Sequence, residues 1–212
     1  LSVTHELKTP IASSKLFAET LLQRKGLYPI QITSSLEKII QEQNRLNELV
    51  EKILLVSTID EMHNDMHLKP ISIHLLIDQI IENTSNSHKL INSVPKDLIV
   101  NGDDFYFISL FQNLLDNAQK YSPDGSEINF YLKENPIKNI ICISDQGIGI
   151  SDKEKSKIFD RFYRIEDEET RNSKGTGLGL FLVNQIIKIH GGKIYCKDNS
   201  PNGAIFEIHL KK

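Results

Sequence analysis

Near the start of the chain, a histidine stands next to an acid, His5-Glu6, in a segment that we expect to be helical. A neutral imidazole can act as a nucleophile or bind a metal, and a neighbouring carboxylate can orient it or accept its proton. A zinc site of the His-Glu-x-x-His type needs a second histidine where Thr9 stands, so this possibility fails. Helical periodicity places His5 and Thr9 together on the polar face. A solvated surface histidine and a nucleophile both fit this position.

A second group of candidate residues lies in the segment NLLDNAQKYSPDG, where Asn113, Asn117 and Lys120 are spaced i, i+4 and i+7. This spacing puts the three side chains on one face of a helix. Carboxamide oxygens suit a hard cation such as Mg²⁺, and a lysine suits phosphate oxygens. Tyr121 adds a flat ring for a base. A polar, solvated helix face explains the residues of this segment equally well when they are taken alone.

A carboxylate follows an apolar strand in SDQGIGIS, where Asp145 precedes Gly147 and Gly149, with Ile148 and Ile150 between and after them. The glycines allow a ligand to approach the backbone. The carboxylate can accept a hydrogen bond from the exocyclic amine of adenine, a donor that guanine lacks at that position. A simple Asp-x-Gly turn is the alternative interpretation.

Two phenylalanines and two arginines alternate in IFDRFYR, which contains Phe159, Arg161, Phe162 and Arg164. The rings can dock the segment onto the core and leave the guanidinium groups for phosphate. Plain anchoring of the rings in the core is expected in either case.

A glycine-rich run, KGTGLGL, leads directly into a helix. Glycines before a helix N-terminus make an anion-binding site. The run lacks the Gly-Lys-Ser/Thr of a P-loop and the spacing of a Rossmann fingerprint. Its candidate residues are Lys174, Gly175, Thr176, Gly177, Leu178, Gly179 and Leu180.

The elements that must position these residues fall into two parts. Residues 1–25 and 33–63 read as helices, separated at Gly26 and Pro29. In the second helix, apolar residues spaced three and four apart form a seam interrupted by Gln43 and Ser57, and the first helix repeats this spacing through Ser14. A hairpin of two such helices makes a poor core alone, so we expect a homodimeric four-helix bundle. Residues 1–66 form this domain.

Residues 67–212 form the second domain, in which the pattern changes to strands and helices. We expect a short strand and an amphipathic helix after residue 67, a strand at LIVNGDD, and a helix from Asp104 to Tyr121. Two hairpins, SEINFYLKE with NIICISD and GGKIYCKDN with GAIFEIHL, flank a helix from Gly179 to His190. These elements predict an α/β sandwich with a mixed sheet.

Composition narrows the class of protein. The 212 residues carry a formal net charge of −3, which gives no electrostatic case for binding nucleic acid. Cys142 and Cys196 lie far apart, so neither a disulfide framework nor a zinc site is indicated. No apolar run reaches the length of a membrane span, so we expect no membrane contact in this stretch. The abrupt start suggests a fragment of a longer protein, and the lack of a disulfide framework makes a reducing, cytoplasmic compartment the expectation. Whether an upstream segment anchors the full-length protein in the inner membrane stays open.

Taken in order, these segments resemble the cytoplasmic core of a sensor histidine kinase from two-component signalling. THELKTP resembles the H box of the dimerisation domain. The segments at Asn113, Asp145, Phe159 and Gly175 resemble the N, G1, F and G2 boxes of the GHKL-type ATP-binding domain. Essentially the whole chain is covered. The departures are Thr4, where a serine is usual before the histidine, and Ala204, where a serine or threonine is usual.

The resemblance implies a fold, substrates and roles. The second domain would adopt the GHKL α/β sandwich and bind ATP with Mg²⁺. His5 would accept the γ-phosphoryl group with help from Glu6 and pass it to an aspartate of a response regulator. Thr9 would align water for dephosphorylating that regulator. Asn117, assisted by Asn113, would bind Mg²⁺, and residues 165–175 would cover ATP. The other ATP-site residues would be Lys120, Tyr121, Asp145, Gly147, Ile148, Gly149, Ile150, Phe159, Arg161, Phe162, Arg164, Lys174, Gly175, Thr176, Gly177, Leu178, Gly179 and Leu180.

Two other functions remain as alternatives. GHKL relatives that hydrolyse ATP carry a glutamate general base where Asn113 stands, and an amide cannot take a proton from water. Asn113 therefore favours transfer to a protein side chain over hydrolysis by a GHKL-type ATPase. A catalytically degenerate scaffold, which binds ATP or a regulator without chemistry, predicts loss of His5, Asn117 or Asp145, and all three are present.

Overall fold

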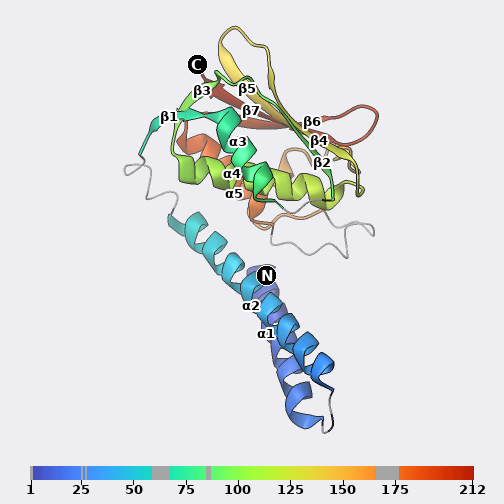
Figure 1. Cartoon of the computed structure of the whole chain (residues 1–212). Helices are drawn as coiled ribbons and strands as arrows, with labels where there is room; N and C mark the ends of the chain where they lie inside the picture. Colours follow the sequence, from blue (N-terminus) through green and yellow to red (C-terminus); the bar gives the residue numbers. More distant parts are fainter. Residues whose placement is uncertain (1, 25, 27, 59–66, 85–86, 166–176) are drawn as a thin grey trace.

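The computed structural model describes residues 2–24, 26, 28–58, 67–84, 87–165 and 177–212, without the side chains of Ser2, Val3, His5, Glu6 and Thr58. A hairpin of two long helices extends from one side of an α/β domain (Figure 1). The predicted fold elements, an antiparallel helical hairpin followed by an α/β structure with a mixed sheet, are thus confirmed.

The hairpin consists of α1 (Ser2–Gln23) and α2 (Pro29–Thr58). Gly26 lies between them with φ +78°, a conformation that glycine adopts without strain, so the predicted helix stop is confirmed. The second helix begins earlier than predicted, since Pro29 occupies its first position, where a missing N–H costs nothing. Pro10 lies inside α1 and is buried.

The two helices meet along a seam with a polar pair in it. Gln43 Nε2 donates a hydrogen bond of 3.2 Å to Ser14 Oγ, so one predicted polar interruption of the α2 seam faces the polar position of the α1 seam. The other interruption, Ser57, donates from Oγ to Ile53 O within α2. The most buried apolar residues of α2 are Leu49 and Val56, whereas Leu36 and Val50 are 47% and 41% exposed within one chain. The apolar stripe of α2 is therefore wider than α1 covers, as the sequence indicated.

The α/β domain is built from short strands and three helices. Its elements are β1 (Lys69–Ser72), α3 (Ile73–Glu82), β2 (Lys89–Ser93), β3 (Ile99–Gly102), α4 (Asp104–Tyr121), β4 (Glu127–Lys133), β5 (Lys138–Ser144), the 3₁₀ turn η2 (Lys157–Phe159), α5 (Gly179–Ile189), β6 (Lys193–Asp198) and β7 (Ala204–Lys211).

The main sheet is mixed, as predicted, with strand order β2-β4-β5-β7-β6. β2 pairs in parallel with β4, and the other pairs are antiparallel. β1 and β3 form a separate antiparallel pair. The strand β2 was not predicted from the sequence, because the segment KLINS is short and polar at both ends and its strand character comes from pairing with β4.

The helices α3, α4 and α5 lie on one side of the main sheet (Figure 1). The core between the layers contains Phe107 and Phe111 of α4 and Phe130 of β4, each at most 2% exposed. Phe111 and Phe130 meet edge to face, with ring centroids 6.3 Å apart. α4 therefore serves as the central support of the domain.

Helix α4 has the predicted bounds for identifiable reasons. The Asp103 side chain caps its N-terminus by accepting a 3.1 Å hydrogen bond from Phe105 N, and the helix ends before Ser122-Pro123. Its apolar face packs on the sheet, Asn113 is buried with this face, and Asn117, one turn further, is half-buried. No described helix is long and apolar enough to cross a membrane, and both cysteines are free.

Candidate nucleotide-binding site

A cavity of about 840 Å³ lies beside the C-terminal half of α4. Its size falls in the range of pockets that hold nucleotide-sized ligands. Residues far apart in the sequence line it, from α4, from the loop after β5, from the segment before α5, and from the β6–β7 turn.

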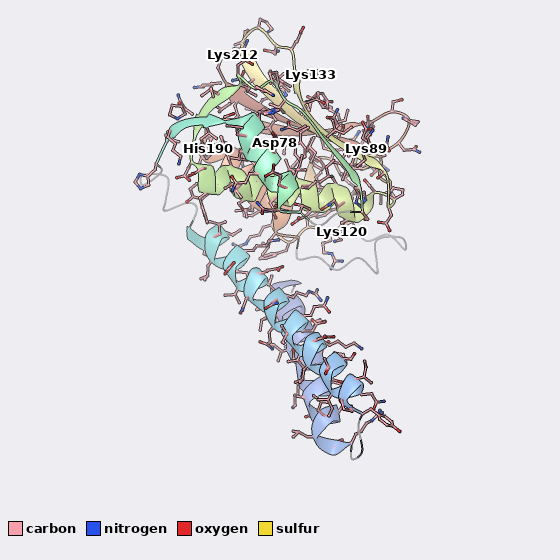
Figure 2. The ribbon with its side chains drawn as sticks, in the orientation of Figure 1. Asp78, Lys89, Lys120, Lys133, His190 and Lys212 are labelled. Carbon is pink, nitrogen blue, oxygen red and sulfur yellow. The ribbon has the colours of Figure 1, made fainter. Side chains whose placement is uncertain are left out.

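One wall of the cavity is the predicted face of α4. Asn113, Asn117, Lys120 and Tyr121 all line it. Asn113 Nδ2 donates a 2.7 Å hydrogen bond to a backbone carbonyl one turn earlier, which leaves its Oδ1 as the outward-facing acceptor. This oxygen would lie 3.0 Å from a Cβ at Gly179, so it points to the start of α5. Lys120, labelled in Figure 2, has its Nζ 4.8 Å above the Tyr121 ring, as a cation–π pair.

The buried carboxylate of Asp145 lies against the cavity and is only 6% exposed. Its Oδ1 accepts hydrogen bonds from Gly147 N (2.9 Å) and Ala204 N (3.1 Å). Burial raises the pKa of Asp145 above the usual aspartate range, and the two N–H groups partly oppose this effect. No described residue donates to Oδ2, so this oxygen can accept a hydrogen bond from a ligand.

Glycines allow two backbone segments to touch Asp145 and α4. A Cβ on Gly147 would lie 2.5 Å from Tyr121 O, and a Cβ on Gly203 would lie 2.0 Å from Asp145 O. Any side chain at either position would push these segments apart. The neighbouring residues Ile148, Gly149 and Ile150 line the cavity, whereas Gly147 lies behind its surface.

The segment with two phenylalanines and two arginines supports the cavity mainly from behind. Phe159 packs edge to face on Phe206, with centroids 6.4 Å apart. Arg161 lies 4.9 Å over the ring of Phe162, and neither residue lines the cavity. Arg164 does line it. Of the two arginines that were expected to face phosphate, Arg164 therefore lines the cavity and Arg161 does not.

The glycine-rich run is described from Gly177 onward, and Lys174, Gly175 and Thr176 lie outside the described residues, as does most of the expected cover at 165–175. Gly177 has φ +67° and its carbonyl accepts a 3.0 Å hydrogen bond from Phe162 N. Gly177, Gly179 and Leu180 line the cavity, and Leu178 is fully buried. The run thus joins the preceding arginine segment at the start of α5.

The predicted phosphoacceptor segment lies on α1. The His5 and Glu6 backbones belong to this helix, and their side chains lie outside the described part of the structure. Thr9 is exposed one turn further along, as helical geometry predicted.

Several cavity residues were absent from the sequence prediction. The β6–β7 turn contributes Asp198, Asn199, Pro201, Asn202, Gly203 and Ala204. Asn199 Nδ2 donates a 2.7 Å hydrogen bond to Asp145 O, which ties this turn to the cavity. The one local signal was the glycine in NGAIF. Lys52 of α2 also lines the cavity, and nothing in the local sequence of α2 indicated it.

The donor set fits a nucleotide with a bound divalent cation. Among the described residues, no group of three histidines, cysteines or carboxylates could hold a metal alone. Amide oxygens at Asn113 and Asn117, next to phosphate oxygens of the ligand, are a suitable partial shell for Mg²⁺, which usually keeps few protein ligands.

Comparison with known proteins agrees with this geometry. Residues 2–61 match the family model described as "His Kinase A (phospho-acceptor) domain". Residues 102–212 match "Histidine kinase-, DNA gyrase B-, and HSP90-like ATPase". The chain is 33% identical over 216 residues to sensor protein SrrB of Staphylococcus aureus (strain N315). The alignment covers all of this chain and 37% of SrrB, so the chain spans a little over a third of this relative.

Solved structures show the same fold. The mycobacterial sensor histidine kinase MprB is 30% identical with a TM-score of 0.60, over 68% of this chain and 97% of that structure. The Acinetobacter baumannii histidine kinase AdeS has a TM-score of 0.72 at 20% identity, over 98% of this chain and 97% of the other, which supports the fold alone. Family, fold and the ATP-type cavity agree, and the chain belongs to the sensor histidine kinases, of which it comprises a core with the GHKL fold.

Proposed function

We propose that this chain transfers the γ-phosphoryl group of Mg-ATP to His5 and then to an aspartate of a response regulator. The observation that carries the proposal is the cavity wall at Asn113, an amide that lines the same cavity as the buried Asp145 carboxylate, in a chain that also contains a phosphoacceptor-type hairpin. An amide at this place can bind a cation but cannot activate water.

The cavity residues suggest how ATP would be held. Asp145 Oδ2 would accept the hydrogen bond of the adenine amine, and Tyr121 would pack against the base. Lys120 and Arg164 would contact phosphate oxygens. Gly177 and Gly179 would let the triphosphate approach the N-terminus of α5, where the helix dipole favours anions.

Asn113 and Asn117 would hold Mg²⁺ by their amide oxygens. The bound ion would neutralise phosphate charge during transfer. The protein contribution would be to orient these two amides, and the hydrogen bond from Asn113 Nδ2 to Ser109 O supports a fixed orientation for Asn113.

The transfer itself is a displacement at phosphorus. A neutral imidazole nitrogen of His5 would form the new bond to the γ-phosphorus while the bond to the β–γ bridging oxygen breaks and ADP leaves. Glu6 would orient the ring or accept the proton that the imidazole loses. The phosphoryl group would then pass to the regulator, and the exposed Thr9 would align water when the regulator is dephosphorylated.

The apolar surface of the hairpin supports a homodimer. Large apolar side chains stay exposed along both helices, among them Ile11 (52%), Ile40 (60%) and Leu54 (58%). Two hairpins that bury these faces would form a four-helix bundle. We accordingly assign residues 1–66 to dimerisation and phosphotransfer and residues 67–212 to ATP binding. ATP and the regulator would meet this core in the cytoplasm.

The proposal is tested by incubating the purified dimer with γ-labelled ATP and Mg²⁺. A phosphohistidine is acid-labile and stable in base, so we expect label with these properties in the wild type and none in His5→Ala. A matched control is His67→Ala, an exposed histidine at the start of the ATP-binding domain, which should be labelled like the wild type. Steady phosphate release without labelled protein would instead support the ATPase, and nucleotide binding without either reaction would support the scaffold.

A further inference from the structure

One residue of the nucleotide cavity comes from the helical hairpin. Lys52 of α2 lines the cavity together with the α4 face and Arg164. It is the sole hairpin residue among the described residues of the lining. A basic residue of the helical hairpin therefore borders the cavity that is proposed to hold the nucleotide.

The end of α2 near Lys52 packs against the ATP-binding domain. Leu49 and Val56 are 5% and 4% exposed and belong to the same continuous apolar cluster as the core of that domain. Ile165 and Leu180, which line the cavity, pack against this cluster too. Lys52 lies one turn from both buried residues on the same side of α2, so its stem follows the packed face and its ammonium group reaches the cavity.

The register of the hairpin places Lys52 at the level of His5. Ser14 and Gln43 face each other through their 3.2 Å hydrogen bond. His5 lies nine residues before Ser14, and Lys52 lies nine residues after Gln43. Because the helices are antiparallel and rise equally, both positions lie about 13.5 Å further along the hairpin. The His5 backbone and Lys52 are thus at about the same height along the hairpin.

We propose that Lys52 binds the γ-phosphate of ATP and positions it between the ATP-binding domain and His5. The inference rests on the proposed function and names one further residue for it. Lys52 neither gains nor loses a proton. The His5 nitrogen forms the bond to phosphorus, the electron pair of the broken bond stays on ADP, and the imidazole proton goes to Glu6 or water. Lys52 balances charge on the transferring oxygens.

This role differs from that of Lys120 and Arg164, which belong to the ATP-binding domain. A contact from α2 to the γ-phosphate can form when ATP is bound and is lost when ADP remains. Lys52 therefore links the terminal phosphate to the position of the hairpin. The binding energy of this contact is available only while the nucleotide carries the γ-phosphate that His5 receives.

The test compares nucleotides that differ in the γ-phosphate. Lys52→Met keeps the apolar stem and removes the charge, Lys52→Arg keeps the charge, and Lys38→Met is the control on the same helix. Lys38 lies 5.3 Å over the Phe17 ring and does not line the cavity. Binding of AMP-PNP and ADP is measured by calorimetry on the dimeric chain, and labelling of the protein by γ-labelled ATP is followed in a single turnover.

We expect Lys52→Met to weaken AMP-PNP binding about tenfold and ADP binding less than about threefold, as loss of a charged hydrogen bond predicts. Single-turnover labelling should fall about 100-fold, with partial recovery in Lys52→Arg and no change in Lys38→Met. Equal losses for both nucleotides, or wild-type AMP-PNP binding in Lys52→Met, would overturn the inference. The binding comparison does not depend on catalysis. If the wild type is not labelled, that result counts against the proposed function, whereas the affinities for AMP-PNP and ADP still test the role of Lys52.

Discussion

Replacing Asp145 with asparagine should weaken ATP binding while it stabilises the nucleotide-free protein. In the wild type, Oδ1 accepts hydrogen bonds from Gly147 N and Ala204 N, and Oδ2 is left for the adenine amine. The asparagine oxygen can replace only one of these acceptors. If the asparagine oxygen accepts the two backbone hydrogen bonds, its NH₂ group faces the amine of adenine, which is also a donor. If the amide turns by 180°, its NH₂ group faces the two backbone N–H donors instead.

The loss of binding can be estimated from this conflict. A hydrogen bond to a charged acceptor contributes about 1.5–3 kcal/mol, and a buried donor left without a partner costs about 1–3 kcal/mol more. A total of about 2.5–6 kcal/mol corresponds to a Kd for ATP that is roughly 60- to 20,000-fold higher. Calorimetric titration with ATP measures this change.

The stability of the nucleotide-free protein should change in the opposite direction. Burial raises the pKa of Asp145, so its contribution to stability is complete below the usual aspartate pKa of about 3.9 and is lost as pH rises through the folded-state value. At pH 7 the buried charge is therefore unfavourable, and Asp145→Asn removes it while it keeps the bonds to Gly147 and Ala204. We expect a higher Tm than wild type at pH 7 and no such gain near pH 3.

Thermal melts with and without ATP provide the assay. Asp97→Asn, at an exposed aspartate outside the cavity, is the control and should resemble the wild type in both measurements. A variant that binds ATP normally would contradict the role of the carboxylate. A variant that melts well below wild type at pH 7 would contradict the assignment of a desolvated charge.

Two further predictions concern other parts of the domain. Gly177→Ala should weaken ATP binding about tenfold or more by calorimetry, because φ is +67° and the new Cβ would lie 2.7 Å from Phe162 C; Gly26→Ala, at φ +78° in open space, should leave it unchanged. His190 accepts a 3.2 Å hydrogen bond from Asp103 N at Nε2, and burial lowers its pKa. Its stabilising contribution is therefore present above about pH 6.5 and lost as pH falls through the lower folded-state value. Urea unfolding between pH 7 and 5 should show a flatter pH dependence in His190→Gln, and an unchanged slope would refute this.

Much of the α/β domain follows from local rules. The bounds of α4 follow from the Asp103 cap and the Ser122-Pro123 stop, and its i, i+4, i+7 spacing alone brings Asn113 and Asn117 to one wall of the cavity. The two long helices follow from apolar periodicity, and their turn follows from Gly26. Such features depend on residues within a few positions of one another, which a sequence displays directly.

Other features depend on contacts between distant segments. β2 becomes a strand through its parallel pairing with β4, and its own residues have weak strand character. The end of α2 is another example. Leu49 and Val56 are buried because they belong to one apolar cluster with the core of the ATP-binding domain, a contact that the periodicity of the two helices does not reveal.

The sequence by itself determined the order of the nucleotide-binding segments, the face of α4 that carries the amides, and the exposed side of α1 that carries Thr9. Only the tertiary structure decided what surrounds Asp145. Ala204 N, 59 residues away in the sequence, is one of its donors, and Gly203 approaches its backbone because no Cβ intervenes. The same holds for Lys52, which reaches the cavity because α2 packs against the ATP-binding domain. Periodicity tells which side of an element is buried, whereas the partner of that side is chosen by packing across the whole chain.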